Sequence, residues 1–203
     1  FSGGLDDYSI SPSGDYALLE IRGELFVKEL DKEESRSVNL SSHPYYDREA
    51  ILLNDEIALF TSDRANNRYQ FYTASSTEEF KPQLYKSLRH EVKQNLMKDG
   101  DLRDLSLSPD GKKISFIHDS HQLVLADISK EGKISNQKVL IDAWHGANGV
   151  SWSPDSRFLA YSHSDLNFNN EVFILPVEGG KEVNVSMHPG RDYSPFWSAD
   201  GSK

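Results

Sequence analysis

VSWSPDSRFLAYS, residues 150–162, joins a short β-prone run, a bend built on Ser-Pro-Asp and a second apolar run. The same order recurs in LSLSPDGKKISFI, residues 105–117, and in YSISPSGDYALLE, residues 8–20. The prolines of the first two stretches are 45 residues apart, and PFWSADG, residues 195–201, carries alanine at the corresponding place another 45 residues on. The chain is therefore built from a repeated unit of strand, turn and strand.

The turn chemistry explains why this unit is a hairpin. In a type I turn, proline suits the second position, aspartate tolerates the third, and glycine accepts the positive φ that follows. Ser108-Pro109-Asp110-Gly111 meets all three requirements, while Ser153-Pro154-Asp155-Ser156 and Ser11-Pro12-Ser13-Gly14 each depart at one position. Apolar residues return at alternate positions after each turn, which is typical of a strand.

Each repeat leaves room for two further strands, such as LFVKEL (25–30) and SVNL (37–40) in the first. Four strands in about 45 residues is the repeat of a β-propeller blade. The sequence therefore predicts an all-β fold, a β-propeller of four-stranded antiparallel blades, with about four blades and one strand of a fifth. The predicted blades cover residues 5–43, 44–99, 100–144 and 145–188, and the fifth begins within 189–203.

The second repeat departs from the pattern. Its proline turn is replaced by Leu53-Asn54-Asp55-Glu56, for which we expect an Asx-type turn. Ser76-Thr77-Glu78-Glu79 resembles a helix capping box, but Pro82 and the alternation that follows leave a short helix and an irregular insertion both open.

Composition excludes several classes of protein. The chain has 203 residues and a formal net charge of −10, so we expect no general binding to nucleic acid or to anionic membranes, which need a basic surface. No apolar run approaches the roughly 20 residues of a membrane span. The absence of cysteine excludes disulfides and thiolate chemistry. FSGGLDDY, residues 1–8, has no signal-peptide pattern, so the compartment stays open between cytoplasm and periplasm, with the periplasm slightly favoured.

The SPDG hairpin with aliphatic and aromatic alternation resembles the propeller repeat of TolB and of tricorn-type serine peptidases. GVSWSPDSRFLAYS, NNEVFILPV and DYSPFWSADG together look more like the tricorn type. LDDYSISPSGDYALLEIRGELFVKEL is similar to the start of a tricorn blade, where a short Arg-Gly-Glu turn leads into the third strand. The resemblance covers nearly the whole chain. It implies the N-terminal propeller of a tricorn-type peptidase, without the catalytic core.

The number of repeats departs from that family, whose propellers close with six or seven blades. The resemblance therefore implies a fragment whose partners include the remainder of its own polypeptide, with further blades and a catalytic domain. Open blade edges would also favour self-association. The family's catalytic serine lies on a separate domain, and no Gly-x-Ser-x-Gly elbow occurs in this sequence, so we expect the chain itself to be non-catalytic and to need no cofactor.

Three groups of residues are candidates for a site. His118-Asp119-Ser120-His121 is the most metal-like cluster, but no third distant ligand is evident, so a solvated loop and no metal are expected. Trp152 and Trp197 occupy equivalent places before the turn, where core packing is favoured over stacking on a ligand. Three arginines each precede the first strand of a repeat: Arg48, Arg103 and Arg191.

In a propeller, connections before the first strands open onto one end of the channel, so these guanidiniums could receive peptide carboxylates by bidentate hydrogen bonds. Salt bridges to the neighbouring Asp47, Asp104 and Asp192 explain the same arginines more simply. The preferred function is a non-catalytic propeller that gates or guides peptide substrates of a tricorn-like peptidase. The alternative is a TolB-like scaffold that holds protein partners in the cell envelope, and a propeller of the prolyl-oligopeptidase type is less favoured.

Overall fold

The computed structural model describes residues 4–31, 35–65, 67–95, 97, 99–144, 146–164, 168–187 and 189–201. These residues form four antiparallel sheets of four strands, in which each strand pairs with the next along the chain. The described residues contain no helix. The predicted all-β architecture of four-stranded propeller blades is therefore confirmed.

The strand bounds follow the repeats. The first sheet contains β1 (Leu5–Ile10), β2 (Tyr16–Ile21), β3 (Glu24–Glu29) and β4 (Ser37–Asn39). The second contains β5 (Asp47–Leu52), β6 (Ile57–Ala65), β7 (Arg68–Ser76) and β8 (His90–Gln94). The third contains β9 (Leu102–Leu107), β10 (Lys113–His118), β11 (Gln122–Ile128) and β12 (Ile134–Asp142). The fourth contains β13 (Asn148–Trp152), β14 (Phe158–Ser164), β15 (Asn170–Pro176) and β16 (Val183–Asn184).

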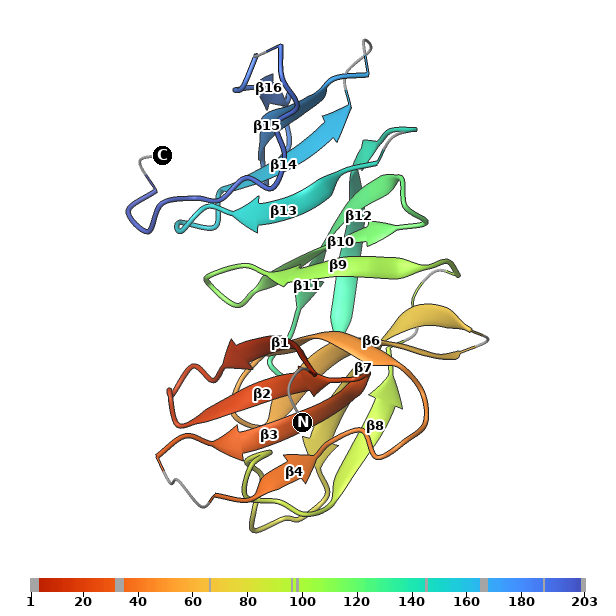
Figure 1. Ribbon diagram of the computed structural model, residues 1–203, viewed down its shortest axis with the longest axis vertical. Coiled ribbons are helices and arrows are strands. Elements are labelled where there is room, and N and C mark those ends of the chain that lie inside the picture. Colours follow the sequence, from red (N-terminus) through yellow and green to blue (C-terminus); the bar gives the residue numbers. More distant parts are fainter. Residues whose placement is uncertain are drawn as a thin grey trace. The chain divides into compact units, whose positions relative to one another are not determined.

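The chain divides into two units, which are described separately. The N-terminal unit comprises residues 1–102 and 129–133 and holds the first two sheets (Figure 1). Its core is one apolar cluster to which both sheets contribute, including Leu18, Leu25, Phe60 and Tyr72. Fully burying one such side chain stabilises the fold by about 1.5–3 kcal/mol. Packing of one sheet on the next therefore stabilises this unit.

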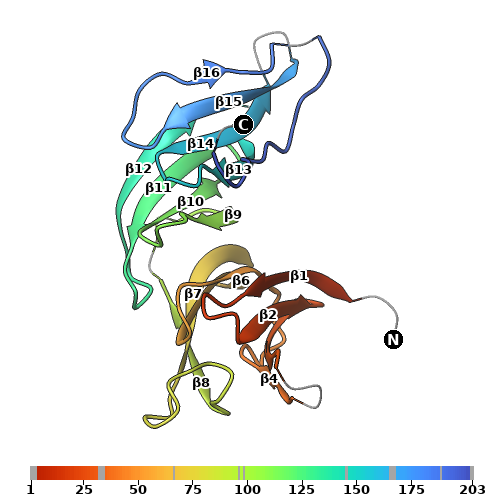
Figure 2. The ribbon, with the colours of Figure 1, turned by 90° about the vertical axis from the view of Figure 1, so that its left-hand side faces the viewer.

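The C-terminal unit comprises residues 103–128 and 134–203 and holds most of the third sheet and all of the fourth. Figure 2 shows the β13–β16 sheet beside the β9–β12 sheet. Their shared apolar cluster includes Leu123, Leu125, Tyr161 and Phe173. Trp152 is 7% exposed and belongs to the same cluster, so its predicted role in core packing is confirmed.

The predicted turns recur with the same hydrogen bonds. The Ser108 hydroxyl donates to Asp110 Oδ1 at 2.7 Å and accepts the Lys113 N–H at 2.9 Å, which closes the turn from inside. The residue that ends each turn is left-handed: Gly14 (φ 78°), Gly111 (φ 70°), Ser156 (φ 61°) and Gly201 (φ 68°). Serine therefore adopts at position 156 a conformation that favours glycine.

A feature that the repeat pattern did not reveal lies in the first strands. Four residues with left-handed φ interrupt the start of a repeat: Glu49, Asp104, Gly149 and Ser194. In β5 and β13 they coincide with shifts of strand register, which identifies them as β-bulges. The last three are 45 residues apart, so the bulge belongs to the repeat as much as the turn does.

In the second repeat, the structure decides between the short helix and the irregular insertion that the sequence left open. The Asn54 Oδ1 accepts the N–H groups of Glu56 and Ile57 at 2.9 and 3.1 Å, which confirms the Asx-type turn. The segment between β7 and β8 is an irregular insertion with turns rather than a helix, and it is held by Leu84, which is fully buried. The Leu84 N–H donates to the Asp55 carbonyl at 3.0 Å, so tertiary packing outweighs the capping signal.

Within the N-terminal unit, a buried ion pair fixes the start of the second sheet. Asp47 is fully buried, and Arg64 Nη2 donates to both of its carboxylate oxygens at 2.9 and 2.8 Å. The Arg64 guanidinium also lies 5.1 Å from the Tyr72 ring centroid, and the Asp47 N–H donates to the Gly23 carbonyl of the first sheet. Asp47 therefore links the two sheets of this unit.

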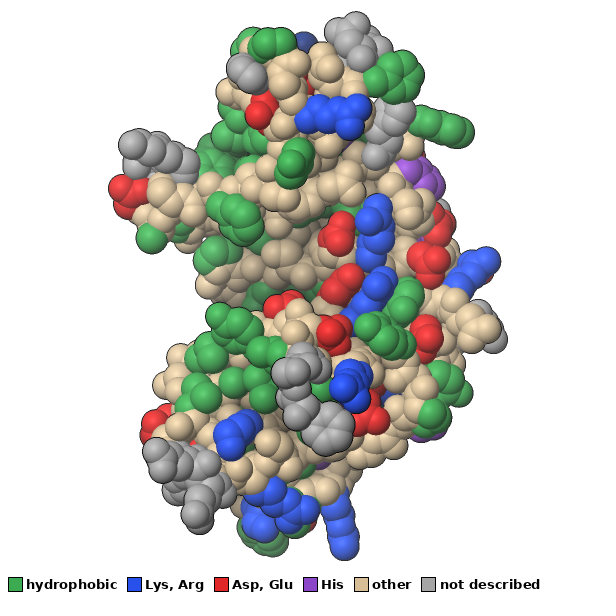
Figure 3. Space-filling model, in the orientation of Figure 1, with side chains coloured by type: hydrophobic (Ala, Val, Ile, Leu, Met, Phe, Trp, Pro, Cys, Tyr) green, Lys and Arg blue, Asp and Glu red, His purple; other side chains and the backbone are tan. Residues whose placement is uncertain are grey.

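The surface carries charges of both signs. On the face shown in Figure 3, acidic and basic side chains are interspersed within each unit. No described residues form a helix that could span a membrane.

Candidate functional site

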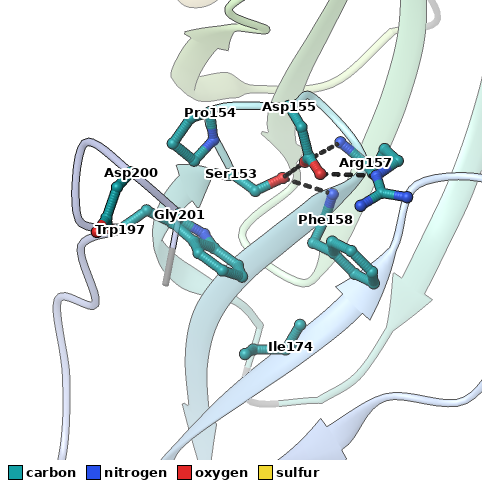
Figure 4. Close-up of a pocket in the computed structure, with 9 residues that line it drawn as sticks. All are labelled: Ser153, Pro154, Asp155, Arg157, Phe158, Ile174, Trp197, Asp200 and Gly201. Carbon is teal, nitrogen blue, oxygen red and sulfur yellow. Dashed lines mark hydrogen bonds and ion pairs between the residues drawn. The ribbon is translucent and has the colours of Figure 1, made fainter. Parts of the chain in front are cut away.

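A pocket of about 540 Å³ lies within the C-terminal unit, beside the β13–β14 turn. Figure 4 shows its walls, which come from this turn, from the strands β14 and β15, and from the segment that follows β16. The lining residues are Ser153, Pro154, Asp155, Arg157, Phe158, Ile174, Trp197, Asp200 and Gly201. We call it the Pro154 pocket.

The segment after β16 runs back alongside β13. The Trp197 Nε1–H donates to the Ser151 carbonyl at 3.2 Å, and a Cβ on Gly149 would lie 3.1 Å from the Ser194 Cα. Ser198 and Asp200 repeat the serine to aspartate hydrogen bond of the proline turns, at 2.7 Å. The predicted fifth start therefore forms its turn. The described residues after β16 have no strand assignment.

The floor of the Pro154 pocket is apolar and aromatic. The rings of Phe158 and Trp197 lie 6.4 Å apart with a 30° tilt, next to Pro154 and Ile174. Concave sites that combine an apolar floor with a few polar groups are typical of ligand pockets. This floor suits an aliphatic or aromatic side chain.

The rim of the Pro154 pocket is charged. Arg157 Nε lies 2.6 Å from Asp155 Oδ2, and the Ser153 hydroxyl donates to Asp155 Oδ1 at 2.7 Å. The hydrogen bond from Ser153, reinforced by Arg157, lowers the pKa of Asp155 to about 2. Asp155 is therefore a carboxylate at neutral pH, and the rim offers both a guanidinium and an acceptor to a polar backbone.

The three predicted arginines do not all occupy the same position. Arg48 and Arg103 each directly precede a left-handed bulge residue, whereas Tyr193 holds that place in the last segment and Arg191 lies two residues earlier. Arg48 stacks on the Tyr69 ring, 3.7 Å from its centroid. Since Arg48 is in the N-terminal unit and the other two are in the C-terminal unit, their convergence stays a prediction.

The neighbouring acids are only partly those expected from the sequence. Arg103 Nη1 lies 3.7 Å from Asp104 Oδ2, which is the simpler pairing expected. Arg48 instead lies 3.8 Å from Glu49 Oε1, because Asp47 binds Arg64. Arg191 is exposed. Two of the three guanidiniums are thus held by adjacent carboxylates.

The histidine cluster lies at the turn between β10 and β11. His118 is buried, and its Nδ1 lies 3.6 Å from Asp119 Oδ2, while His121 is turned toward Asp142 of β12. Among the described residues, no group of three His, Asp or Glu side chains is placed to hold a metal ion. Trp144 lies beside this cluster and was not among the residues predicted from the repeats, although a tryptophan between a strand and a glycine-containing loop is a usable signal.

Known proteins are similar to this chain both in sequence and in fold. No family model matches the sequence. A tricorn protease from Thermoplasma volcanium is 25% identical over 206 residues, which cover 97% of this chain and 18% of that protein. The chain thus spans about a fifth of the length of this curated relative.

Solved structures agree on the fold. The crystal structure of the tricorn protease has a TM-score of 0.69 at 16% identity, covering 98% of this chain and 18% of that one. A protein from Agrobacterium tumefaciens described as TolB has a TM-score of 0.68 at 17% identity, covering 97% of this chain and 67% of that one. TolB from Acinetobacter baumannii has a TM-score of 0.62. These likenesses show a β-propeller fold, and the resemblance predicted from the repeats is confirmed.

Proposed function

We propose, from its similarity to tricorn protease along 97% of its length, that this chain is a propeller domain that guides or gates peptide substrates. In this proposal, hydrolysis takes place on a catalytic domain outside the chain, in a parent protein that is a serine peptidase. The similarity in sequence is the observation that carries the proposal, because it extends over all four repeats rather than over one motif.

The Pro154 pocket supports this role. Its floor of Phe158, Ile174 and Trp197 suits the apolar side chain of an extended peptide, and the Asp155–Arg157 pair at the rim suits the peptide's polar backbone. The Ser153 hydroxyl is already engaged with Asp155 and with the Phe158 N–H at 2.9 Å, so it serves the turn rather than attacking a peptide bond. Binding without hydrolysis is what this arrangement can do.

The test is binding of short unstructured peptides, measured by fluorescence anisotropy. Trp197→Ala removes part of the aromatic floor of the pocket and should weaken binding of peptides with an aromatic or aliphatic residue by roughly tenfold, the scale of an interface hot spot. Phe196→Ala is the matched control, because this neighbouring ring is 86% exposed and does not line the pocket. Equal binding by both variants would count against the Pro154 pocket as the peptide site.

We extend the proposal to Arg48, Arg103 and Arg191 as groups that receive a peptide carboxylate. A guanidinium binds a terminal carboxylate by two hydrogen bonds, and amidation of the peptide removes that charge. Peptides with a free C-terminus should therefore bind more tightly than their amides. If amidation leaves affinity unchanged, the arginines do not serve this purpose.

A TolB-like scaffold that holds folded protein partners is the second candidate. The fold fits this candidate as well as the first, since the TM-score is 0.68 for the TolB structure and 0.69 for the tricorn protease. The two candidates differ in the state of the ligand that they bind. Preference for unfolded peptides over the same sequences in folded proteins supports the peptidase-associated role, and the reverse preference supports the scaffold.

A further inference from the structure

A second pocket, of about 360 Å³, lies in the C-terminal unit and is separate in its lining from the Pro154 pocket. It is lined by Asp119, Ser120, His121, Asp142 and Trp144. These residues come from the β10–β11 turn, from the end of β12 and from the connection that follows β12. Both segments lie at the same end of the third sheet, since Gln122 at the start of β11 pairs with Asp142 at the end of β12.

Trp144 is the unusual member of this pocket. Its side chain is 91% exposed, whereas Trp152 is buried in the core. At the corresponding connection of the first sheet, the Tyr46 ring instead covers the turn, so closely that a Cβ on Gly23 would lie 2.5 Å from it. Trp144 does not cover its own turn in this way, so core packing does not account for an indole at this place.

Backbone hydrogen bonds tie the described residues on either side of Trp144 to their neighbours. The Ala143 N–H donates to the His121 carbonyl at 3.1 Å, and the Gly146 N–H donates to the Ala143 carbonyl at 2.8 Å. Gly146 has φ 63°, and a Cβ there would lie 2.1 Å from the Ser120 carbonyl oxygen, so the two segments are in direct backbone contact. Ala143 and Gly146 thus hold this loop against the β10–β11 turn, which places Trp144 beside Ser120 and His121.

The polar groups of this pocket are acceptors. The Asp119 and Asp142 side chains are 44% and 58% exposed. His121 Nδ1 donates to the Asp119 carbonyl at 2.8 Å, which leaves Nε2, 3.8 Å from Asp142 Oδ1, as the ring nitrogen that faces the pocket and as an acceptor in the tautomer protonated at Nδ1. None of the described residues that line the pocket is Lys or Arg. An exposed indole face beside two carboxylates attracts a cation by cation–π and ionic interactions together.

We propose that this pocket, between the β10–β11 turn and Trp144, binds the guanidinium of an arginine side chain. The planar guanidinium stacks on the indole of Trp144 and donates to Asp142, while a second N–H donates to His121 Nε2 or Asp119. Arginine suits this arrangement better than lysine, because its donors lie in the plane that stacks on an aromatic ring.

The test uses N-acetyl-arginine amide and its neutral isostere N-acetyl-citrulline amide, titrated into the ¹⁵N-labelled chain. The arginine probe should shift the indole N–H resonance of Trp144, while those of Trp152 and Trp197 stay in place, and citrulline should shift none. Trp144→Ala and Asp142→Asn should each weaken binding, measured by calorimetry, by about three- to thirtyfold. Phe80→Ala, which removes a ring that is 92% exposed elsewhere, is the matched control and should leave affinity unchanged.

Two further measurements distinguish a guanidinium carried by a peptide from that of the free amino acid. A short arginine-containing peptide that binds more tightly than free arginine identifies a peptide, and equal binding identifies the free amino acid. Equal affinity for citrulline, or unchanged binding in Trp144→Ala, would overturn the proposal. Because the two pockets share no lining residue, loss of peptide binding at the Pro154 pocket would leave the arginine result intact.

Discussion

The buried Asp47–Arg64 pair offers a sharp test of how the N-terminal unit is held together. Asp47 is fully buried, the Arg64 side chain is 14% exposed, and the two groups form two hydrogen bonds of 2.8–2.9 Å. Asp47→Asn keeps the size of the side chain and removes its charge. Arg64 is then left as a buried cation without a counter-ion.

Removing one partner of a buried ion pair costs about 3–5 kcal/mol, because the remaining charge loses its compensation. With a urea slope of about 2 kcal/mol per M, the unfolding midpoint of the N-terminal unit should fall by about 1.5–2.5 M. Arg64→Met should cost a similar amount, since it leaves Asp47 unpaired. The double variant should cost less than the sum of the two, because neither charge is then left buried.

The assay is urea unfolding followed by circular dichroism, with Asp99→Asn as the matched control. Asp99 lies 3.1 Å from Arg68 in the same unit, but the side chains are 88% and 52% exposed. An exposed pair contributes less than about 1 kcal/mol, so this variant should unfold almost as the parent does. If Asp47→Asn costs no more than Asp99→Asn, or if the two buried substitutions are additive, the reasoning fails.

Two other predictions concern the proline turns. Gly111→Ala, at φ 70°, should lower the free energy of unfolding by about 1 kcal/mol, because alanine is strained in this left-handed conformation. Ser156→Gly should change it by less than about 1 kcal/mol, because relief of the left-handed serine is offset by loss of the exposed hydrogen bond from the Asp110 N–H to Ser156 Oγ. Thermal melts in which Gly111→Ala is not the more destabilised variant would contradict this. The carboxyl of Asp155 should titrate near pH 2, so its interactions stabilise the fold above pH ~4 and are lost as the pH falls toward 2. Ser153→Ala should raise this pKa toward the ordinary value, as carboxyl NMR would show.

The sequence predicts the fold well because the turn chemistry is local. Ser-Pro-Asp-Gly closes its own hairpin through the serine hydroxyl and the aspartate, without help from distant residues. β2 (Tyr16–Ile21) and β10 (Lys113–His118) illustrate this, since each begins directly after its turn, where the apolar alternation starts. Local patterns therefore determined where strands begin and end.

Long-range contacts explain what the sequence did not predict. The insertion before β8 is irregular because Leu84 is buried in the core of the N-terminal unit, which a capping pattern does not report. Asp47 pairs with Arg64 rather than with Arg48. Successive residues of a strand point to opposite faces of the sheet, so Asp47 and Arg48 point apart, and the bulge at Glu49 further changes where the Arg48 side chain lies.

The candidate pockets were harder to predict than the fold. Trp197 was expected in the core because it shares a repeat position with Trp152, yet it lines the Pro154 pocket, where the segment after β16 runs back along β13. Trp144 stands in a loop between two repeats, outside any periodic pattern. Pockets form where segments distant in sequence meet. A repeat pattern therefore indicates which residues are candidates, but not how these residues are arranged around a pocket.

The central claim is that this propeller domain binds unfolded peptides at the Pro154 pocket without hydrolysing them. Amide hydrogen exchange measured with and without a saturating unstructured peptide tests it most directly, with mass spectrometry of the recovered peptide. We predict slower exchange in residues 153–158 and 197–201, together with intact peptide. Unchanged exchange in both segments, or peptide cleavage that disappears when one serine of the chain is replaced, would contradict the account.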